Sequence, residues 1–362
     1  MDIEERVSLI KQVGQEVLTE DELRELLASK KNPLAYDGFE PSGQIHIAQG
    51  LLRTININRM LEAGCDFTFL IADWHAWINN KYGGDMEKIK TAGEYFIEVW
   101  KACGLKDGVE FVWSSEMMGD PTYWEKVIQI GRHSTLTRVL RTTQIMGRSE
   151  KDELSAAQIF YPCMQAADIF HMDIDICQLG MDQRKVNILA RELGPKLFGR
   201  KPVAVHHHML LGLQQQPHAA SGESGKTDAV ERAIAMKMSK SNPASAIFMT
   251  DDPDVVTSKI AKAYCPERKA EDNPVLEYCR HIIFARMKTL RIDRPEKFGG
   301  PLELGSYDEL AAKYVDGHLH PMDLKKGVAG AINDLLDPIR MHFAKGKPAK
   351  LLEQIRSFDI TR

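Results

Sequence analysis

The sequence predicts an α/β protein in which a parallel sheet precedes a mainly helical region. Two apolar runs, residues 67–72 and 109–113, are separated by a helical stretch over residues 86–103. Strands that alternate with helices at this spacing are typical of βαβ units and a parallel sheet. The pattern returns with strand candidates at 175–179 and 202–211 around a helical stretch at 186–193. Ligands of such sheets bind at the carboxyl ends of the strands, so the loops there form the candidate site.

The first 50 residues lead into this sheet. Residues 3–28 are amphipathic, which predicts a helical segment over residues 1–32. A short strand over 33–39 follows, and the loop Glu40-Pro41-Ser42-Gly43 is expected to open a helix near His46.

A change of composition marks the end of the α/β region. Residues 214–231 are rich in Gln, Ser, Gly and charge, as in a flexible excursion. After them, Asp252 can cap a helix that has Pro253 at its first position. The sequence beyond is mostly helical, so we place a domain boundary near residue 250.

Composition is that of a soluble globular protein. The 362 residues are 43% hydrophobic and 27% charged, enough for a sizeable core and about two domains. The net charge of -4 excludes a generally basic nucleic-acid coat, so any RNA contact must use local patches such as the arginine-rich residues 132–148. The acidic start lacks an apolar signal segment, and no apolar run approaches the ~18 residues of a membrane span. We therefore expect a cytoplasmic protein without membrane contact.

Cysteines and histidines give no sign of a metal centre. The six cysteines are scattered without CxxC spacing, which indicates reduced thiols rather than disulfides or a zinc site. The run His206-His207-His208 lies in a predicted strand, where adjacent side chains point to opposite faces. No Cys or carboxylate stands near it in the sequence. We expect no protein-bound metal or prosthetic group.

A polar stripe occupies one face of a predicted helix. Tyr161, Gln165 and Asp168 are spaced by four and three residues, so they share that face beside apolar neighbours. Taken alone, the stripe also fits an exposed helix face. If it lines a pocket, Tyr161 and Gln165 can accept from a substrate ammonium group and Asp168 from a hydroxyl further in. Such a pocket would select a long amino acid with a polar tip.

The run Lys237-Met238-Ser239-Lys240-Ser241 is the candidate phosphate clamp. Two lysines separated by two residues, in a segment that follows a flexible excursion, suit the charge of a polyphosphate in a transition state. A K-x-x-K pair alone is also common in exposed turns. His46-Ile47-Ala48-Gln49, almost two hundred residues earlier, is its expected partner.

Several motifs together resemble those of one family. They occur in the same order as in tyrosyl-tRNA synthetases, and the chain is most similar to the archaeal and eukaryotic cytosolic type. The match covers residues 33–343, nearly the whole chain. The motifs are Tyr36 to Gly43, His46 to Gln49, Ala72 to Ala76, Tyr161 to Asp168, Met181 to Lys185, Lys237 to Ser241, Arg294 to Gly300 and His320 to Lys325.

The resemblance implies a reaction and a set of site residues. ATP, as its Mg²⁺ complex, would activate L-tyrosine to tyrosyl-adenylate, and tyrosine would then pass to tRNA(Tyr). The family binds the phenol hydroxyl at the positions of Tyr36 and Asp168. It binds the amino group at the positions of Tyr161, Gln165 and Gln183.

The family's nucleotide site maps onto a second set of residues. Asp182 matches the position that holds the ribose, and His46, Lys237 and Lys240 match the residues that stabilise charge on the phosphates. The full ATP-binding set implied is Gly38, His46, Gln49, Gly180, Asp182, Met209, Leu210, Lys237, Met238, Ser239, Lys240 and Ser241. The run His46-Ile47-Ala48-Gln49 stands where the family has its HIGH motif, and we call it the HIGH-like motif. It departs from the family because Gln49 replaces the second histidine, and a glutamine side chain cannot be cationic.

The resemblance also implies a domain plan and an RNA surface. Residues 33–250 would form a Rossmann-fold catalytic domain with a homodimer interface around 110–160, and residues 251–362 a helical anticodon-binding domain. Phe298, His320 and Asp323 match positions that read the first anticodon base, by stacking and hydrogen bonding. Alone, they also fit a loop Phe, a capping His and an N-cap Asp. Arg141 and Arg184 match residues that reach the acceptor stem, or would otherwise be solvated arginines.

Two alternatives remain at this point. A tryptophanyl-tRNA synthetase shares the fold and both phosphate motifs, although Asp168 with Tyr36 favours a phenol over an indole. A synthetase-like protein that binds RNA or a partner without catalysis is the other. The retained His46, Asp182 and lysines argue against a loss of catalysis.

Overall fold

A six-stranded, mostly parallel sheet is the centre of the molecule. The computed structural model describes residues 1–147, 153–214, 238 and 243–359. The sheet order is β1-β6-β5-β2-β3-β4; only β1 runs antiparallel, alongside β6. The strands are β1 (Gly14–Leu18), β2 (Leu34–Phe39), β3 (Asp66–Ile71), β4 (Val109–Trp113), β5 (Ile176–Gly180) and β6 (Val203–His207).

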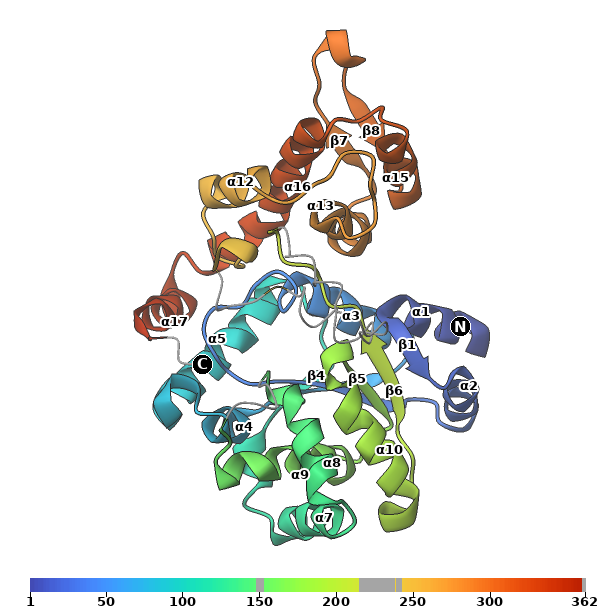
Figure 1. The fold of residues 1–362 in the computed structure, drawn as a ribbon, viewed down its shortest axis with the longest axis vertical. Helices are drawn as coiled ribbons and strands as arrows, with labels where there is room; N and C mark the ends of the chain where they lie inside the picture. The colour runs from blue at the N-terminus through green and yellow to red at the C-terminus, as the bar shows by residue number, and fades with distance from the viewer. Residues whose placement is uncertain (148–152, 215–237, 239–242, 360–362) are drawn as a thin grey trace, which may run out of the picture.

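Helices cover both faces of this sheet (Figure 1). Because both faces are covered, β5 and β6 are buried along their whole length, which explains their continuous apolar runs. One face packs on α1 (Ile3–Val13), α3 (Leu51–Glu62) and α5 (Met86–Ala102). The other packs on α7 (Pro121–Arg132), α8 (Leu136–Thr142), α9 (Ala156–His171) and α10 (Arg184–Phe198). The shorter helices of this half are α2 (Glu20–Ser29), α4 (Asp73–Ile78) and α6 (Ser114–Met117).

The C-terminal part is mainly helical and lies on the side of the sheet covered by α3 and α5 (Figure 1). Its core is continuous with the core on that face of the sheet. Asp252 occupies the N-cap position of its first helix and Pro253 follows, as predicted, although the Asp252 side chain makes no capping hydrogen bond. The helices are α12 (Pro253–Ala261), α13 (Pro274–Tyr278), α14 (Phe284–Arg286), α15 (Tyr307–Val315), α16 (Pro321–His342) and α17 (Gly346–Ser357). A small antiparallel ribbon joins β7 (Leu290–Ile292) to β8 (Leu302–Leu304).

The predicted order of strands and helices is confirmed, and two local expectations are wrong. The N-terminal segment is not all helical, because β1 separates α1 from α2 and adds an edge strand to the sheet. The strand expected over 202–211 ends at His207. The boundary near residue 250 and the functional division into domains stay predictions.

Among the residues the structure describes, none of the helices has the length and apolar character needed to span a bilayer.

Candidate active site

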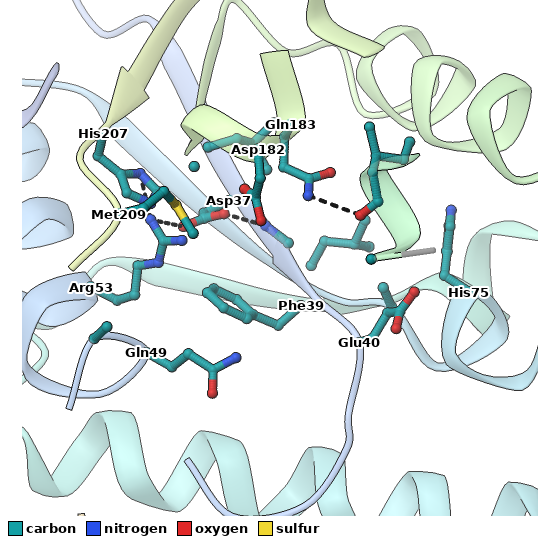
Figure 2. Close-up of a pocket in the computed structure, with 18 of the residues that line it drawn as sticks. Asp37, Phe39, Glu40, Gln49, Arg53, His75, Asp182, Gln183, His207 and Met209 are labelled. Atoms are coloured by element: carbon teal, nitrogen blue, oxygen red, sulfur yellow. Dashed lines mark hydrogen bonds and ion pairs between the residues drawn. The ribbon is translucent and has the colours of Figure 1, made fainter. Parts of the chain in front are cut away.

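A pocket opens at the carboxyl ends of β2 and β5. These two strands are neighbours in the sheet although β3 and β4 intervene in the chain, so the crevice between them is the expected ligand position. Figure 2 shows Glu40 and His75 at one end of the pocket and Arg53 and His207 at the other. Every described candidate for tyrosine or ATP lines it: Tyr36, Gly38, His46, Gln49, Tyr161, Gln165, Asp168, Gly180, Asp182, Gln183, Met209, Leu210 and Met238.

Asp168 is fixed at the inner end of the pocket. It lies on α9 and is fully buried. The Tyr123 hydroxyl donates to its Oδ1 at 2.8 Å, and Nε2 of His75 lies 3.2 Å from its Oδ2. The Tyr36 hydroxyl is also buried here and has no hydrogen-bond partner among the described residues. An unpaired buried hydroxyl is costly, so this position calls for a ligand with a polar group.

Burial and the Asp168 carboxylate influence the protonation of Tyr36 and His75. Burial raises the pKa of Tyr36 well above its ordinary value, and the Asp168 carboxylate raises it further, so Tyr36 is a neutral hydroxyl that can donate. Burial lowers the pKa of His75, but attraction to Asp168 outweighs it and the net pKa is raised. His75 therefore favours its charged form beside the carboxylate.

The outer end carries acceptors suited to an ammonium group. Tyr161 donates its hydroxyl to Glu40 Oε1 at 2.6 Å, which leaves the hydroxyl oxygen free to accept. Gln165 Nε2 donates to Gln183 Oε1 at 3.1 Å, and Gln183 Nε2 donates to the Ile145 carbonyl at 3.2 Å. These bonds fix the Gln165 amide so that its Oε1 remains an acceptor. The polar face predicted for Tyr161, Gln165 and Asp168 thus does line a pocket.

Gly180 allows close packing at the part of the pocket that Asp182 and Met209 line. A Cβ at this position would lie 2.5 Å from Asp182 Oδ1 and 2.8 Å from Met209 Sδ. Such distances do not occur for real Cβ atoms, so a side chain here would displace both neighbours. Glycine is required by close approach rather than by its backbone angle.

His46 lies where an extended segment passes into a hydrogen-bonded turn. Ile47 N donates to Ile247 O at 2.8 Å, and Met249 N donates to Ile45 O at 2.9 Å. This pairing includes a bridge between His46 and Phe248, while the His46 carbonyl accepts from Gln49 N at 2.8 Å and from Gly50 N at 2.9 Å. Residues 47–50 therefore form a hydrogen-bonded turn and not a regular helix. The expected helix start near His46 is therefore wrong, and α3 begins at Leu51. The pairing connects the HIGH-like segment to the stretch just after the lysine run.

Only Met238 of the lysine run is described. Its side chain is buried, and its backbone N–H donates to Leu210 O at 3.0 Å. That contact places Met238 beside Leu210, which follows β6 and also lines the pocket. The predicted Lys237, Ser239, Lys240 and Ser241 lie outside the described residues.

The histidine run does alternate between faces, and carboxylates from distant parts of the sequence lie close to it. Nδ1 of His206 lies 2.8 Å from Glu16 Oε2, and Nε2 of His208 lies 3.1 Å from Glu277 Oε1. No carboxylate is near the run in the sequence, but β1 pairs with β6 and brings Glu16 beside His206 from 190 residues away. Among the described residues, no group of three His, Cys, Asp or Glu is placed to hold a metal ion.

The six cysteines are free thiols, as expected.

The residues predicted to contact tRNA lie in two parts of the molecule. Arg141 is exposed on α8, whereas Arg184 at the start of α10 is not a solvated arginine, because its Nε lies 2.8 Å from Glu16 Oε2. Phe298 is 58% exposed, in a short 3-10 turn, η6 (Glu296–Phe298). His320 caps α16 by accepting from Met322 N, and Asp323 lies in its first turn rather than at the N-cap.

Arg294 connects the turn that carries Phe298 with the segment just before α16. It donates to Gly300 O at 3.0 Å and to His318 O at 2.7 Å. The turn that carries Phe298 is therefore held beside the start of α16.

Some pocket residues were not predicted as site residues. Glu40 and His75 stand inside motifs that carried the resemblance, yet no role was inferred for them. Tyr123 lies in a helix whose pattern gave no sign of contact with Asp168. A buried cluster at one end of the pocket consists of Asp37, Arg53 and His207. Only the alternation of side chains along the strand at His207 could have indicated this cluster.

Comparison with known proteins decides the family. The family model for class I tRNA synthetases (W and Y) matches residues 28–337. The cytoplasmic tyrosine–tRNA ligase 1 of Arabidopsis thaliana is 50% identical over 366 residues, covering 100% of this chain and 90% of the plant protein. The chain belongs to the tyrosyl-tRNA synthetases. It is thus a tyrosine–tRNA ligase of the archaeal and eukaryotic type, which activates tyrosine with ATP and charges tRNA.

Solved structures of this tyrosyl-tRNA synthetase family agree. The Pyrococcus horikoshii enzyme complexed with L-tyrosine has a TM-score of 0.89 and 40% identity, over 99% of this chain and 100% of that chain. A tryptophanyl-tRNA synthetase from Encephalitozoon cuniculi, bound to tryptophan, reaches a TM-score of 0.70 at 16% identity, over 98% and 94% of the chains. That similarity shows the fold alone. The tryptophanyl and non-catalytic alternatives are therefore not supported.

Proposed function

We propose that the substrate tyrosine enters with its phenol innermost, between Tyr36 and Asp168. The observation that carries this proposal is the buried Tyr36 hydroxyl, which lacks a partner beside a carboxylate whose position is fixed by Tyr123 and His75. A phenol hydroxyl can donate to Asp168 and accept from Tyr36. Phenylalanine would leave the buried Tyr36 hydroxyl unpaired and would add no donor to Asp168. Tyrosyl-tRNA synthetases are themselves the standard example of such hydroxyl-based discrimination, and the roughly 10⁵-fold preference over phenylalanine is a known property of the class.

The ammonium group of the substrate is bound by Tyr161, Gln165 and Gln183. The two hydrogen bonds that orient the glutamine amides support this assignment. Glu40 adds a carboxylate next to the Tyr161 hydroxyl, so the outer end of the pocket is electrostatically suited to a cation.

ATP occupies the other half, with its ribose at Asp182 and its adenine against the backbone near Gly38, Gly180 and Met209. The tyrosine carboxylate attacks the α-phosphorus in line, and pyrophosphate leaves. No protein nucleophile is needed, so catalysis consists of positioning and charge stabilisation. His46, Lys237 and Lys240, with the Mg²⁺ that accompanies ATP, stabilise the developing charge. Gln49 lines the pocket but contributes only neutral hydrogen bonding.

The tRNA contacts both ends of the molecule. Arg141 and Arg184 approach the acceptor stem, while Phe298, His320 and Asp323 read the first anticodon base. The exposed ring of Phe298 and its attachment to the start of α16 through Arg294 support a base-stacking role. Residues 33–250 form the catalytic domain and 251–362 the anticodon-binding domain.

The enzyme works as a cytoplasmic homodimer. Three large apolar side chains are about half exposed in the region predicted for the interface: Ile128, Leu136 and Phe160. Exposed apolar residues gathered in one region are typical of a surface that a partner covers. The cytoplasmic assignment is supported by the name of the Arabidopsis relative.

ATP–pyrophosphate exchange tests this proposal. Tyrosine should support exchange, whereas tryptophan and phenylalanine at the same concentration should not. The enzyme should then charge a tRNA(Tyr) transcript, and a change in the first anticodon base should reduce charging without affecting exchange. Exchange that runs equally well with phenylalanine would contradict the assignment of Tyr36 and Asp168.

A further inference from the structure

A buried polar cluster lies below the nucleotide half of the pocket. Strand alternation and sheet order place Asp37 of β2, Gln178 of β5 and His207 of β6 on the same face of the sheet, the face that α3 covers. Arg53 of α3 meets them there: its Nη1 lies 3.4 Å from Asp37 Oδ2 and contacts His207 Nδ1 (Figure 2). All four side chains are buried. None of the sequence patterns or motif matches assigned a role to Arg53.

The hydrogen bonds define the state of His207. Gln178 Nε2 donates to His207 Nδ1 at 2.6 Å, and the Arg53 guanidinium is directed at the same nitrogen. Both partners are donors here, so Nδ1 is an acceptor and the ring proton is on Nε2. Burial lowers the pKa of His207 well below its ordinary value, and the charge of Arg53 lowers it further. His207 is thus a neutral ring with an N–H donor on the side away from Arg53.

That Nε2 is directed towards the proposed ribose position. It lies 3.3 Å from the point where a Cβ of Gly180 would stand, and the same point is 2.5 Å from Asp182 Oδ1. His207, Gly180 and Asp182 therefore meet at one spot on the pocket wall. A donor and a carboxylate side by side suit a vicinal diol, whose hydroxyls both donate and accept.

Two carboxylates approach each other at this spot. The pKa of Asp37 is raised to about 6, because burial and the charge of Asp182 raise it more than attraction to Arg53 lowers it. Among the described residues, Arg53 supplies a positive charge here: its Nη1 lies 3.4 Å from Asp37 Oδ2, and although burial lowers its pKa, the charges of Asp37 and Asp182 raise it. Without that cation, two acids would compete for ionisation at the ribose position.

We propose that Arg53 is a positioning residue for ATP, which fixes His207 as an Nε2–H donor and keeps the Asp182 carboxylate available to the ribose. This inference rests on the proposed function, in which Asp182 binds the ribose. Arg53 is buried, and its guanidinium carbon lies 5.0 Å from the centre of the Phe39 ring. In this position the side chain acts through its neighbours rather than on the phosphates.

Kinetics of the full-length enzyme test the inference by separating the two substrates. In ATP–pyrophosphate exchange, Arg53→Met should raise the KM for ATP by about tenfold or more, the loss typical of hydrogen bonds to charged groups. The KM for tyrosine should change less than about twofold, because that half of the pocket is untouched. Arg53→Lys keeps the charge and should lose less than Arg53→Met. The matched control is Arg59→Met on the same helix, where the guanidinium bonds the Gln12 carbonyl away from the pocket.

A double variant separates positioning from simple charge compensation. Arg53→Met leaves Asp37 as a buried unpaired acid, so urea unfolding should show a loss of stability that Asp37→Asn restores. The KM for ATP should stay high in the double variant, because His207 Nδ1 has still lost its Arg53 donor and keeps only that of Gln178. Recovery of that KM together with stability would mean that Arg53 is only a structural counterion. An unchanged ATP KM in Arg53→Met, a parallel rise for tyrosine, or equal losses in the Lys and Met variants would also overturn the inference.

The wild-type measurement distinguishes a failure of the proposed function from a failure of the Arg53 inference. If the wild-type enzyme shows no tyrosine-dependent exchange, the proposed function fails before any variant is compared. If it does and the Arg53 variants behave like Arg59→Met, only the positioning role fails. Should Arg53→Met not fold, Arg53→Lys and the double variant still carry the comparison.

Discussion

Nε2 of His75 lies 3.2 Å from Oδ2 of Asp168, and both side chains are almost completely buried. With the Tyr123 hydroxyl on the other oxygen, both carboxylate oxygens of Asp168 are held by the protein before a substrate arrives. The residue expected to read the phenol is therefore fixed in place. Pre-organisation of this kind lowers the cost of binding a polar group in a buried site.

This pair makes stability depend on pH through His75. Three carboxylates face the ring, those of Asp168, Glu40 and Asp73, and together they raise its pKa in the folded state despite burial. The stabilisation is fully present below the unfolded pKa of about 6.5 and is lost as the pH rises through the higher folded pKa. Urea unfolding of wild type and His75→Gln between about pH 5 and pH 9 should show the largest difference at the acidic end, about 3 kcal/mol. A difference that grows with pH would contradict the ion pair.

Removing the Tyr36 hydroxyl should reduce the preference for tyrosine. Tyr36→Phe leaves the substrate phenol with one partner fewer, so kcat/KM for tyrosine should fall by about tenfold while phenylalanine is little affected. Exchange kinetics with both amino acids measure the ratio. The control is Tyr278→Phe, which deletes another buried hydroxyl without a described partner, but in the C-terminal part. A similar change in the ratio for both variants would exclude a specific role for Tyr36.

A methyl group at Gly180 should weaken ATP binding selectively. Gly180→Ala forces Asp182 and Met209 apart, so the KM for ATP should rise by about tenfold or more while tyrosine binding is retained. Gly330→Ala is the matched control, because no atom lies within 4 Å of its added Cβ. That control should leave both KM values unchanged. Equal ATP affinity for Gly180→Ala and wild type would show that the ribose does not lie against Asp182.

The two lysines of the 237–241 run should act on chemistry rather than on tyrosine binding. Lys237→Ala and Lys240→Ala should each slow adenylate formation by about a hundredfold or more, because charge on the leaving pyrophosphate loses its stabilisation. Gln49 cannot compensate, since it is neutral. Stopped-flow adenylate formation and equilibrium dialysis with tyrosine separate the two steps, with the exposed Lys313→Ala as control. Wild-type rates in either variant would refute the assignment.

The apolar surface on α7, α8 and α9 should control assembly. Leu136→Glu and Phe160→Glu place a charge on side chains that are 62% and 49% exposed, and the dimer should dissociate because a buried unpaired charge is costly. Light scattering after gel filtration reports the mass. Val315→Glu, 45% exposed in the C-terminal part, should remain dimeric. If all three variants keep the wild-type mass, either this surface is not the interface or the protein is not a dimer.

Much of the fold could be read from local patterns. The run at 109–113 coincides with β4, and the helix expected over 86–103 is α5 to within one residue. The strand β1 was missed because its residues are only half buried and carry no apolar run. His46 was expected at a helix start because Gly43 and the polar loop before it are typical of one. His46 instead pairs with Phe248 and begins a turn, so the regular helix starts only at Leu51, and no local pattern predicts the contact with residues 247–249.

The sequence by itself determined the family, the reaction and the described candidate residues that line the pocket. Helical spacing was sufficient to place Tyr161, Gln165 and Asp168 on one face, since neighbours within an element follow from its period. Only the tertiary structure decided that His75 and Tyr123 hold Asp168, or that Arg53 meets Asp37 and His207. These contacts join separate elements, and they depend on strand register and helix packing, which are set by burial over the whole chain rather than by any local period.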